Sequence, residues 1–108
     1  MHWLRFDALT ASVCNLRPTS RGTVHITSRD VDAAPEISPN YLSTSEDRRV
    51  AIDSLRLVRR IVHETRAMRP YACIEHSPGA AAQSDDALLA AASNIGTTIF
   101  HPVGAFFF

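Results

Sequence analysis

The chain carries five histidines, and the residues around one of them suit acid–base chemistry. His101 follows an apolar run and directly precedes Pro102. Because proline disfavours helical geometry at the residue before it, the backbone at His101 is expected to be extended. Imidazole titrates near neutral pH and is a common general base. The residues leave two interpretations open: a general base held in place, or a buried histidine satisfied by one hydrogen bond.

The other histidines and the cysteines do not predict a metal centre. The histidines lie at positions 2, 25, 63 and 76, and the sequence contains no HxH, HExxH or HxxxH pair. A zinc site usually takes at least two ligands from one local segment. Cys14 and Cys73 lie in separate apolar segments outside any CxxC pattern, which indicates buried free thiols.

Patterns typical of three other function classes are missing from the sequence. The glycines, at positions 22, 79, 96 and 104, form no G-x-G pair of the kind that phosphate cradles use. No G-x-S-x-G elbow is present, so a serine hydrolase is not predicted. The 11 basic and 11 acidic residues give no net charge that would attract nucleic acid.

An uncharged stretch from Ala87 to Phe108 is long enough to cross a bilayer. It contains Asn94, Gly96, His101 and further polar residues, so a membrane span is not expected. The N-terminal residues include charges and no apolar leader, which argues against a secretory signal. We therefore expect a cytoplasmic protein.

Two strands are predicted in the first part of the chain. Thr10–Leu16 is short and uncharged, and Thr23–Thr27 alternates apolar and polar residues. The polar residues 17–22 between them contain proline and glycine, which predicts an antiparallel pair joined by a loop. Residues 28–42 are expected to form an irregular connection, with apolar anchors at Ile37, Tyr41 and Leu42.

Two helices are predicted after this connection. Ser43 and Glu46 have the spacing of a capping box, and apolar residues then recur in helical steps until about Arg66. Ser84 precedes Asp85 and Asp86, which favours a second helix ending near Gly96. Between the helices we expect a short strand over residues 71–76 and a turn at 78–79. This order predicts an α+β fold, a small antiparallel sheet packed with helices.

Several short motifs occur in the order in which one enzyme family has them. They are Asn15–Val24 (NLRPTSRGTV), Pro39–Ser43 (PNYLS), Arg59–Ile61, Ser77–Gly79, Ser84–Asp86 and Thr97–Gly104 (TTIFHPVG). Together they resemble the glucose–methanol–choline (GMC) oxidoreductases, which are FAD-dependent alcohol oxidases and dehydrogenases, and most of all the members similar to choline dehydrogenase.

The resemblance implies a fold and a role for His101. The fold is that of the family's C-terminal, substrate-binding part. His101 corresponds to the catalytic histidine, which takes the proton of the alcohol hydroxyl while hydride passes to flavin N5. Arg17 and Arg21 are implied to be fold-stabilising donors, and Asn40 and Tyr41 to be packing and hydrogen-bonding groups.

The resemblance also implies an organisation for the chain. We expect residues 1–9 to be a truncated lead-in, 10–104 a partial GMC C-terminal domain, and 105–108 an aberrant apolar tail. The glycine-rich FAD domain and the second active-site residue of the family are missing, so cofactor-binding residues stay unknown. The expected function is that of a fragment of an FAD-dependent oxidoreductase that acts on CH–OH donors and is inactive alone. The alternative is a non-catalytic interaction module, or a subunit that complements a separate FAD-binding chain.

Overall fold

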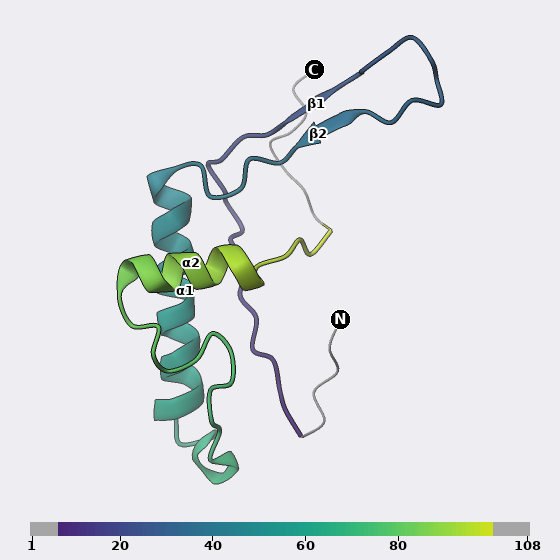
Figure 1. The fold of residues 1–108 in the computed structure, drawn as a ribbon. Helices are drawn as coiled ribbons and strands as arrows, with labels where there is room; N and C mark the ends of the chain where they lie inside the picture. Colours follow the sequence, from purple (N-terminus) through teal and green to yellow (C-terminus); the bar gives the residue numbers. More distant parts are fainter. Residues whose placement is uncertain (1–6, 101–108) are drawn as a thin grey trace.

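The computed structural model describes residues 7–100 and shows a helical body from which a β-hairpin arm extends (Figure 1). The elements are β1 (Thr23–His25), β2 (Glu36–Ser38), α1 (Ser45–Glu64), the short 3₁₀ helix η1 (Arg69–Tyr71) and α2 (Asp85–Ile95). The molecule is elongated, with extents of 58 × 32 × 23 Å. Two helices with a small antiparallel sheet confirm the predicted α+β class.

The hairpin pairs β1 with β2, and this pairing differs from the predicted one. Val24 lies opposite Ile37 in an antiparallel register. A strand at Thr23 is confirmed, but its partner β2 lies inside the stretch predicted to be irregular. A Cβ atom on Gly22 would lie 2.4 Å from the carbonyl oxygen of Ser38, so the close approach of the two backbone segments requires glycine there.

Thr10–Leu16 is not a strand, which corrects the prediction. Its polar groups are engaged elsewhere, because the side chain of Asn15 donates a hydrogen bond of 3.2 Å to the carboxylate of Asp47 on α1. Ile37 and Tyr41, predicted to be apolar anchors, are 64% and 66% exposed. The hairpin therefore contributes little to the core.

Helix α1 begins one residue later than the capping-box spacing predicted. Thr44 is the N-cap, and its hydroxyl accepts a 3.2 Å hydrogen bond from the backbone N–H of Asp47. Ser43 is used differently, since its own N–H donates to the hydroxyl oxygen of Ser20. The helix ends at Glu64, where Thr65 donates its hydroxyl hydrogen back to the carbonyl of Ile61.

Residues 66–83 connect the helices without the predicted strand at 71–76. η1 occupies the start of this connection, and Ala72 follows it in a left-handed conformation with φ of 44°, which does not belong to a strand. The predicted turn at 78–79 is present, with Gly79 at a φ of 93° that favours glycine.

Helix α2 has the predicted cap and end, and it forms the core with α1. The hydroxyl of Ser84 accepts from the N–H of Ala87, and Gly96 is the C-cap. α2 crosses α1 (Figure 1), and within residues 7–100 the buried apolar side chains are Leu88 of α2 and Ile52 of α1. The core is therefore a small contact at this crossing.

Candidate functional site

The N-terminal turn of α1 contains Asp47, a buried carboxylate that accepts hydrogen bonds from residues 15–20. One oxygen of Asp47, Oδ1, accepts from the Thr19 N–H at 2.9 Å, and from the side chains of Asn15 and Thr19 at 3.2 Å each. The other oxygen, Oδ2, accepts from the Ser20 N–H at 2.8 Å. Asp47 is 4% exposed, and it fixes residues 15–20 against the start of the helix.

The environment of Asp47 keeps its carboxylate ionised. Burial by itself raises the pKa, because it disfavours the charged form. Hydrogen bonds from the hydroxyl and N–H of Ser20 and from the N–H and hydroxyl of Thr19 lower the pKa and outweigh burial. The net pKa of Asp47 lies well below its usual range. The carboxylate is thus a permanent acceptor, which suits a structural role and excludes proton exchange near neutral pH.

Two of the sequence motifs meet beside Asp47. The hydroxyl oxygen of Ser20 accepts from the Ser43 N–H at 3.0 Å, and the Asn40 side-chain amide donates to the Arg21 carbonyl at 3.0 Å. The guanidinium of Arg21 donates to two nearby backbone carbonyls, as a fold-stabilising donor does. Arg17 donates its backbone N–H to the Asn15 side chain. The motif 15–24 and the motif 39–43 therefore build one structural unit.

The predicted catalytic residue, His101, lies outside the described residues. The structure describes the segment that leads to it: α2 ends at Gly96, and residues 97–100 continue without regular structure. The Phe100 N–H donates to the Thr98 hydroxyl at 3.0 Å, and the Phe100 side chain is 84% exposed.

Arg59 of α1 holds the loop that leads into α2. Its Nε and Nη2 atoms donate to the Glu75 carboxylate at 3.0 and 2.8 Å. Its remaining N–H groups reach the backbone carbonyls of Gly79 at 3.1 Å and Ala82 at 2.7 Å. The two charged side chains are 17% and 13% exposed, so the ion pair is largely shielded from solvent. This paired guanidinium positions residues 75–82 just before the Ser84 cap.

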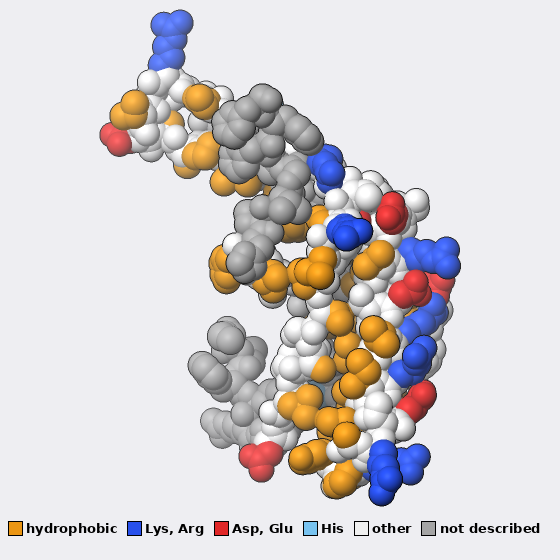
Figure 2. Space-filling view, turned by 180° about the vertical axis from the view of Figure 1, so that it is seen from behind, with side chains coloured by type: hydrophobic (Ala, Val, Ile, Leu, Met, Phe, Trp, Pro, Cys, Tyr) orange, Lys and Arg blue, Asp and Glu red, His pale blue; other side chains and the backbone are white. Residues whose placement is uncertain are grey.

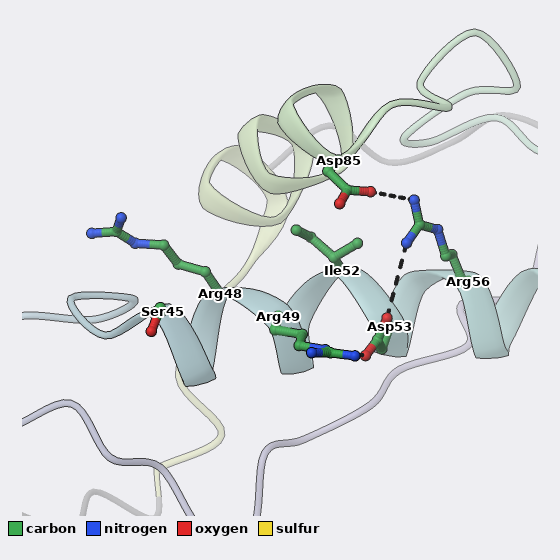
Figure 3. Close-up of a pocket in the computed structure, with 7 residues that line it drawn as sticks. All are labelled: Ser45, Arg48, Arg49, Ile52, Asp53, Arg56 and Asp85. Atoms are coloured by element: carbon green, nitrogen blue, oxygen red, sulfur yellow. Dashed lines mark hydrogen bonds and ion pairs between the residues drawn. The ribbon is translucent and has the colours of Figure 1, made fainter.

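An open hollow of about 380 Å³ lies where the start of α1 faces α2 (Figure 3). Arg56 bridges Asp53 and Asp85 there, and Arg49 lies 3.7 Å from Asp53. Arg49 and Arg56 therefore pair with the two aspartates of the hollow, whereas Arg48 donates to the backbone carbonyls of Leu42 and Ser43. The lining residues of the hollow are Ser45, Arg48, Arg49, Ile52, Asp53, Arg56 and Asp85.

The described residues form no cluster of side chains that could hold a metal ion. In residues 7–100 no three metal-ligating side chains cluster together. Every buried side-chain nitrogen or oxygen of this part has a hydrogen-bond partner. Over the same range, no helix is long and apolar enough to cross a membrane.

Comparison with known proteins agrees with the order of the motifs. A family model for the C-terminal domain of GMC oxidoreductases matches residues 18–106. The chain belongs to the GMC oxidoreductase family. It is 40% identical over 92 residues to an oxygen-dependent choline dehydrogenase of Citrobacter koseri, a match that covers 85% of this chain and 16% of that protein.

Further oxygen-dependent choline dehydrogenases match to a similar extent. Those of Acinetobacter baumannii and Proteus mirabilis are each 39% identical, over 85% and 88% of this chain and 16% and 17% of their own lengths. The chain thus spans about a sixth of the curated relatives that it matches. No solved structure matches.

Asp47 is a buried structural group that the sequence did not predict. Its position carried a signal, because Asp47 shares a helix face with Ala51, Ser54 and Val58, which follow it at steps of four, three and four residues. A carboxylate on the inward face of a helix needs strong hydrogen-bond donors. The donors are residues 15, 19 and 20 of the motif at residues 15–24, and they lie 27 to 32 positions away from Asp47.

Proposed function

We propose that this chain is the His101-bearing part of an FAD-dependent oxidoreductase that acts on the CH–OH group of a small alcohol, similar to choline dehydrogenase. The observation that carries the proposal is the 40% identity over 85% of the chain to an oxygen-dependent choline dehydrogenase. The ordered motifs support the same assignment, since TTIFHPVG resembles the family's motif that carries the catalytic histidine.

In this proposal the chain contributes a base. His101 accepts the proton of the alcohol hydroxyl, for which an imidazole that titrates near neutral pH is suited. In the proposal the hydride acceptor is a flavin held by the rest of the enzyme, since the matched stretch is 16% of the length of the Citrobacter koseri relative. Asp47 holds residues 15–20 against α1, and Arg59 holds the loop before α2, which supports a structural role for both side chains.

The proposal is tested in a chimera. The matched 92-residue stretch of the Citrobacter koseri enzyme is replaced by the corresponding residues of this chain, and choline-dependent flavin reduction is measured. We expect an active chimera in which His101→Asn lowers kcat/KM by about 10²- to 10⁴-fold. His25→Gln, a change at an exposed histidine of β1, is the matched control and should leave the rate unchanged.

Two results would contradict the proposal. One is a chimera whose activity survives His101→Asn with an unaltered pH profile. The other concerns the isolated 108-residue chain, which we expect to stay colourless and inactive when mixed with excess FAD and primary alcohols. A yellow, active preparation of the chain alone would refute its role as a part of a larger catalytic unit.

A further inference from the structure

One side of α1 carries a row of exposed and mostly charged side chains. Figure 3 shows Ile52 projecting toward α2, and an α-helix turns by about 100° per residue. The side chains of the row lie about 60–140° around the helix from Ile52, to one side of the contact with α2. In Figure 2, basic and acidic side chains alternate along the edge of the molecule where α1 lies. We call this row the outer stripe, and it consists of Arg49, Asp53, Leu57, Arg60 and Glu64.

The charges of the outer stripe have weak partners or none within the described part of the chain. Asp53 is 59% exposed, and its ion pairs with Arg49 and Arg56 are 3.7 and 3.9 Å long. Exposed pairs of this length contribute little to stability. Over residues 7–100, neither Arg60 nor Glu64 forms an ion pair. These side chains can therefore pair with another molecule without breaking a strong contact.

The order of the charges along the outer stripe is complementary to itself when the helix is reversed. The signs run positive, negative, positive, negative from Arg49 through Asp53 and Arg60 to Glu64. In an antiparallel pair of α1 helices, one register places Asp53 opposite Arg60 of the second copy. The same register places Arg49 opposite Glu64, because both pairs are centred between residues 56 and 57. A two-fold axis at that point makes each of these opposite-charge pairs twice.

Leu57 lies at the centre of this register. Its side chain is 44% exposed, and the two-fold axis brings it against Leu57 of the second copy. Contact between the two leucines removes apolar surface from water, which favours association. The neighbouring Arg56 lies about 100° away around the helix and pairs with Asp85 of α2, so its charge does not face its own copy. The centre of the register is therefore apolar, and the charges lie on either side of it.

We propose that two copies of this chain associate through the outer stripes of their α1 helices, antiparallel about a two-fold axis between residues 56 and 57. Charge complementarity selects this occupant, because a second copy supplies the opposite charge at each position of the stripe. The contact is limited to one helix of 20 residues, about 30 Å long, from each copy. Interfaces of this size bury less than about 1,200 Å² in total and are weak, so we expect a reversible dimer.

The test measures the mass of the full 108-residue chain by size-exclusion chromatography with light scattering over a wide range of concentrations. At low salt we expect the mass to rise with concentration from 11.9 kDa towards twice that value. Added salt should shift the equilibrium towards the monomer, because exposed ion pairs are screened. Asp53→Arg sets like charges opposite one another across the axis and should weaken the dimer by about tenfold or more.

A charge exchange identifies the paired residues. Arg60→Asp alone should weaken the dimer as Asp53→Arg does, and the double variant should restore it. Positions 53 and 60 are about 10 Å apart along one helix, so restored association requires a pair between copies. Arg29→Asp is the matched control, since it changes the charge as Arg60→Asp does at an exposed residue outside α1, and it should leave the dimer unchanged. Circular dichroism of each variant checks that α1 is retained.

Three results would overturn the inference. The chain could stay monomeric at every concentration, it could form a dimer or larger species that Asp53→Arg does not weaken, or the double variant could fail to associate although α1 is retained. The second result would assign self-association to another exposed surface of the chain. The inference does not depend on the proposed function, because the chimera that tests His101 is measured by its activity and not by its mass.

Discussion

Replacing Asp47 by asparagine should destabilise the chain, because the hydrogen bond that Oδ2 of Asp47 accepts from the Ser20 N–H would be lost. The substituted amide keeps one oxygen for the donors of residues 15 and 19, but its NH₂ group would face the Ser20 N–H, which now lies 2.8 Å from Oδ2. A hydrogen bond to a charged group contributes about 1.5–3 kcal/mol, and an unsatisfied buried donor costs about 1–3 kcal/mol. We expect Asp47→Asn to lower the free energy of unfolding by about 3 kcal/mol at pH 7.

The same carboxylate predicts a change of stability with pH. The folded pKa of Asp47 is lower than its unfolded pKa, so the unfolded state takes up the proton first as the pH falls. The stabilisation is fully present above about pH 4 and is lost progressively below it, by at most about 1.4 kcal/mol per pH unit. Because an asparagine side chain cannot ionise, Asp47→Asn should remove this contribution to the pH dependence.

Urea unfolding followed by circular dichroism at 222 nm measures both effects. With a denaturant slope of about 1.5 kcal/mol/M, a loss of about 3 kcal/mol moves the midpoint by about 2 M. Asp53→Asn is the control, because Asp53 is 59% exposed on the same helix and its two ion pairs are 3.7 and 3.9 Å long. It should change the stability by less than about 1 kcal/mol. Equal effects of the two substitutions, or an unchanged pH dependence in Asp47→Asn, would refute this reasoning.

Two further substitutions test the supports of the helices and the hairpin. Arg59→Met removes the close pair with Glu75 and leaves this largely buried carboxylate with only His63 Nε2 nearby, at 3.9 Å, which should cost about 3 kcal/mol and increase hydrogen exchange over residues 75–83. Arg56→Met, at a side chain that is 45% exposed, should have a much smaller effect, and similar exchange in the two variants would contradict the role of Arg59. Gly22→Ala places a Cβ atom 2.4 Å from the Ser38 carbonyl oxygen and should separate the hairpin strands. Loss of the cross-strand NMR contacts between β1 and β2 checks this, and retention of those contacts would show that the hairpin can relax.

Elements whose ends depend on neighbouring residues could be predicted from the sequence, whereas elements whose ends depend on distant residues could not. α2 was predictable because its cap and its C-terminal glycine lie within the element itself: Ser84 accepts from Ala87, and Gly96 ends the helix. The start of α1 was predicted one residue early, because the Ser43 N–H is taken by Ser20, which lies 23 positions away. The spacing of capping residues in the sequence does not show that a hydroxyl group 23 positions away accepts this hydrogen bond.

The pairing of the strands also depended on contacts with distant residues, which the local sequence pattern did not show. Alternation in Thr23–Thr27 indicated a strand but could not choose its partner, since Thr10–Leu16 and Glu36–Ser38 are both short and lack strong patterns. Asn15 and Thr19 bind Asp47, which leaves the stretch before them without a strand partner among residues 7–100. The return of residues 36–38 beside Gly22 then gives β1 its partner.

The sequence by itself predicted the second helix from residue types at short spacing, and the α+β class from the order of the elements. The order of its motifs indicated the family, and that resemblance implied that His101 is the candidate base. The tertiary structure decided which segments meet at Asp47, how Arg59 joins α1 to the loop before α2, and which apolar side chains remain exposed. These outcomes depend on hydrogen bonds and packing between residues 16 to 32 positions apart, and on how little of the apolar surface two crossing helices can bury. Local patterns contain neither kind of information.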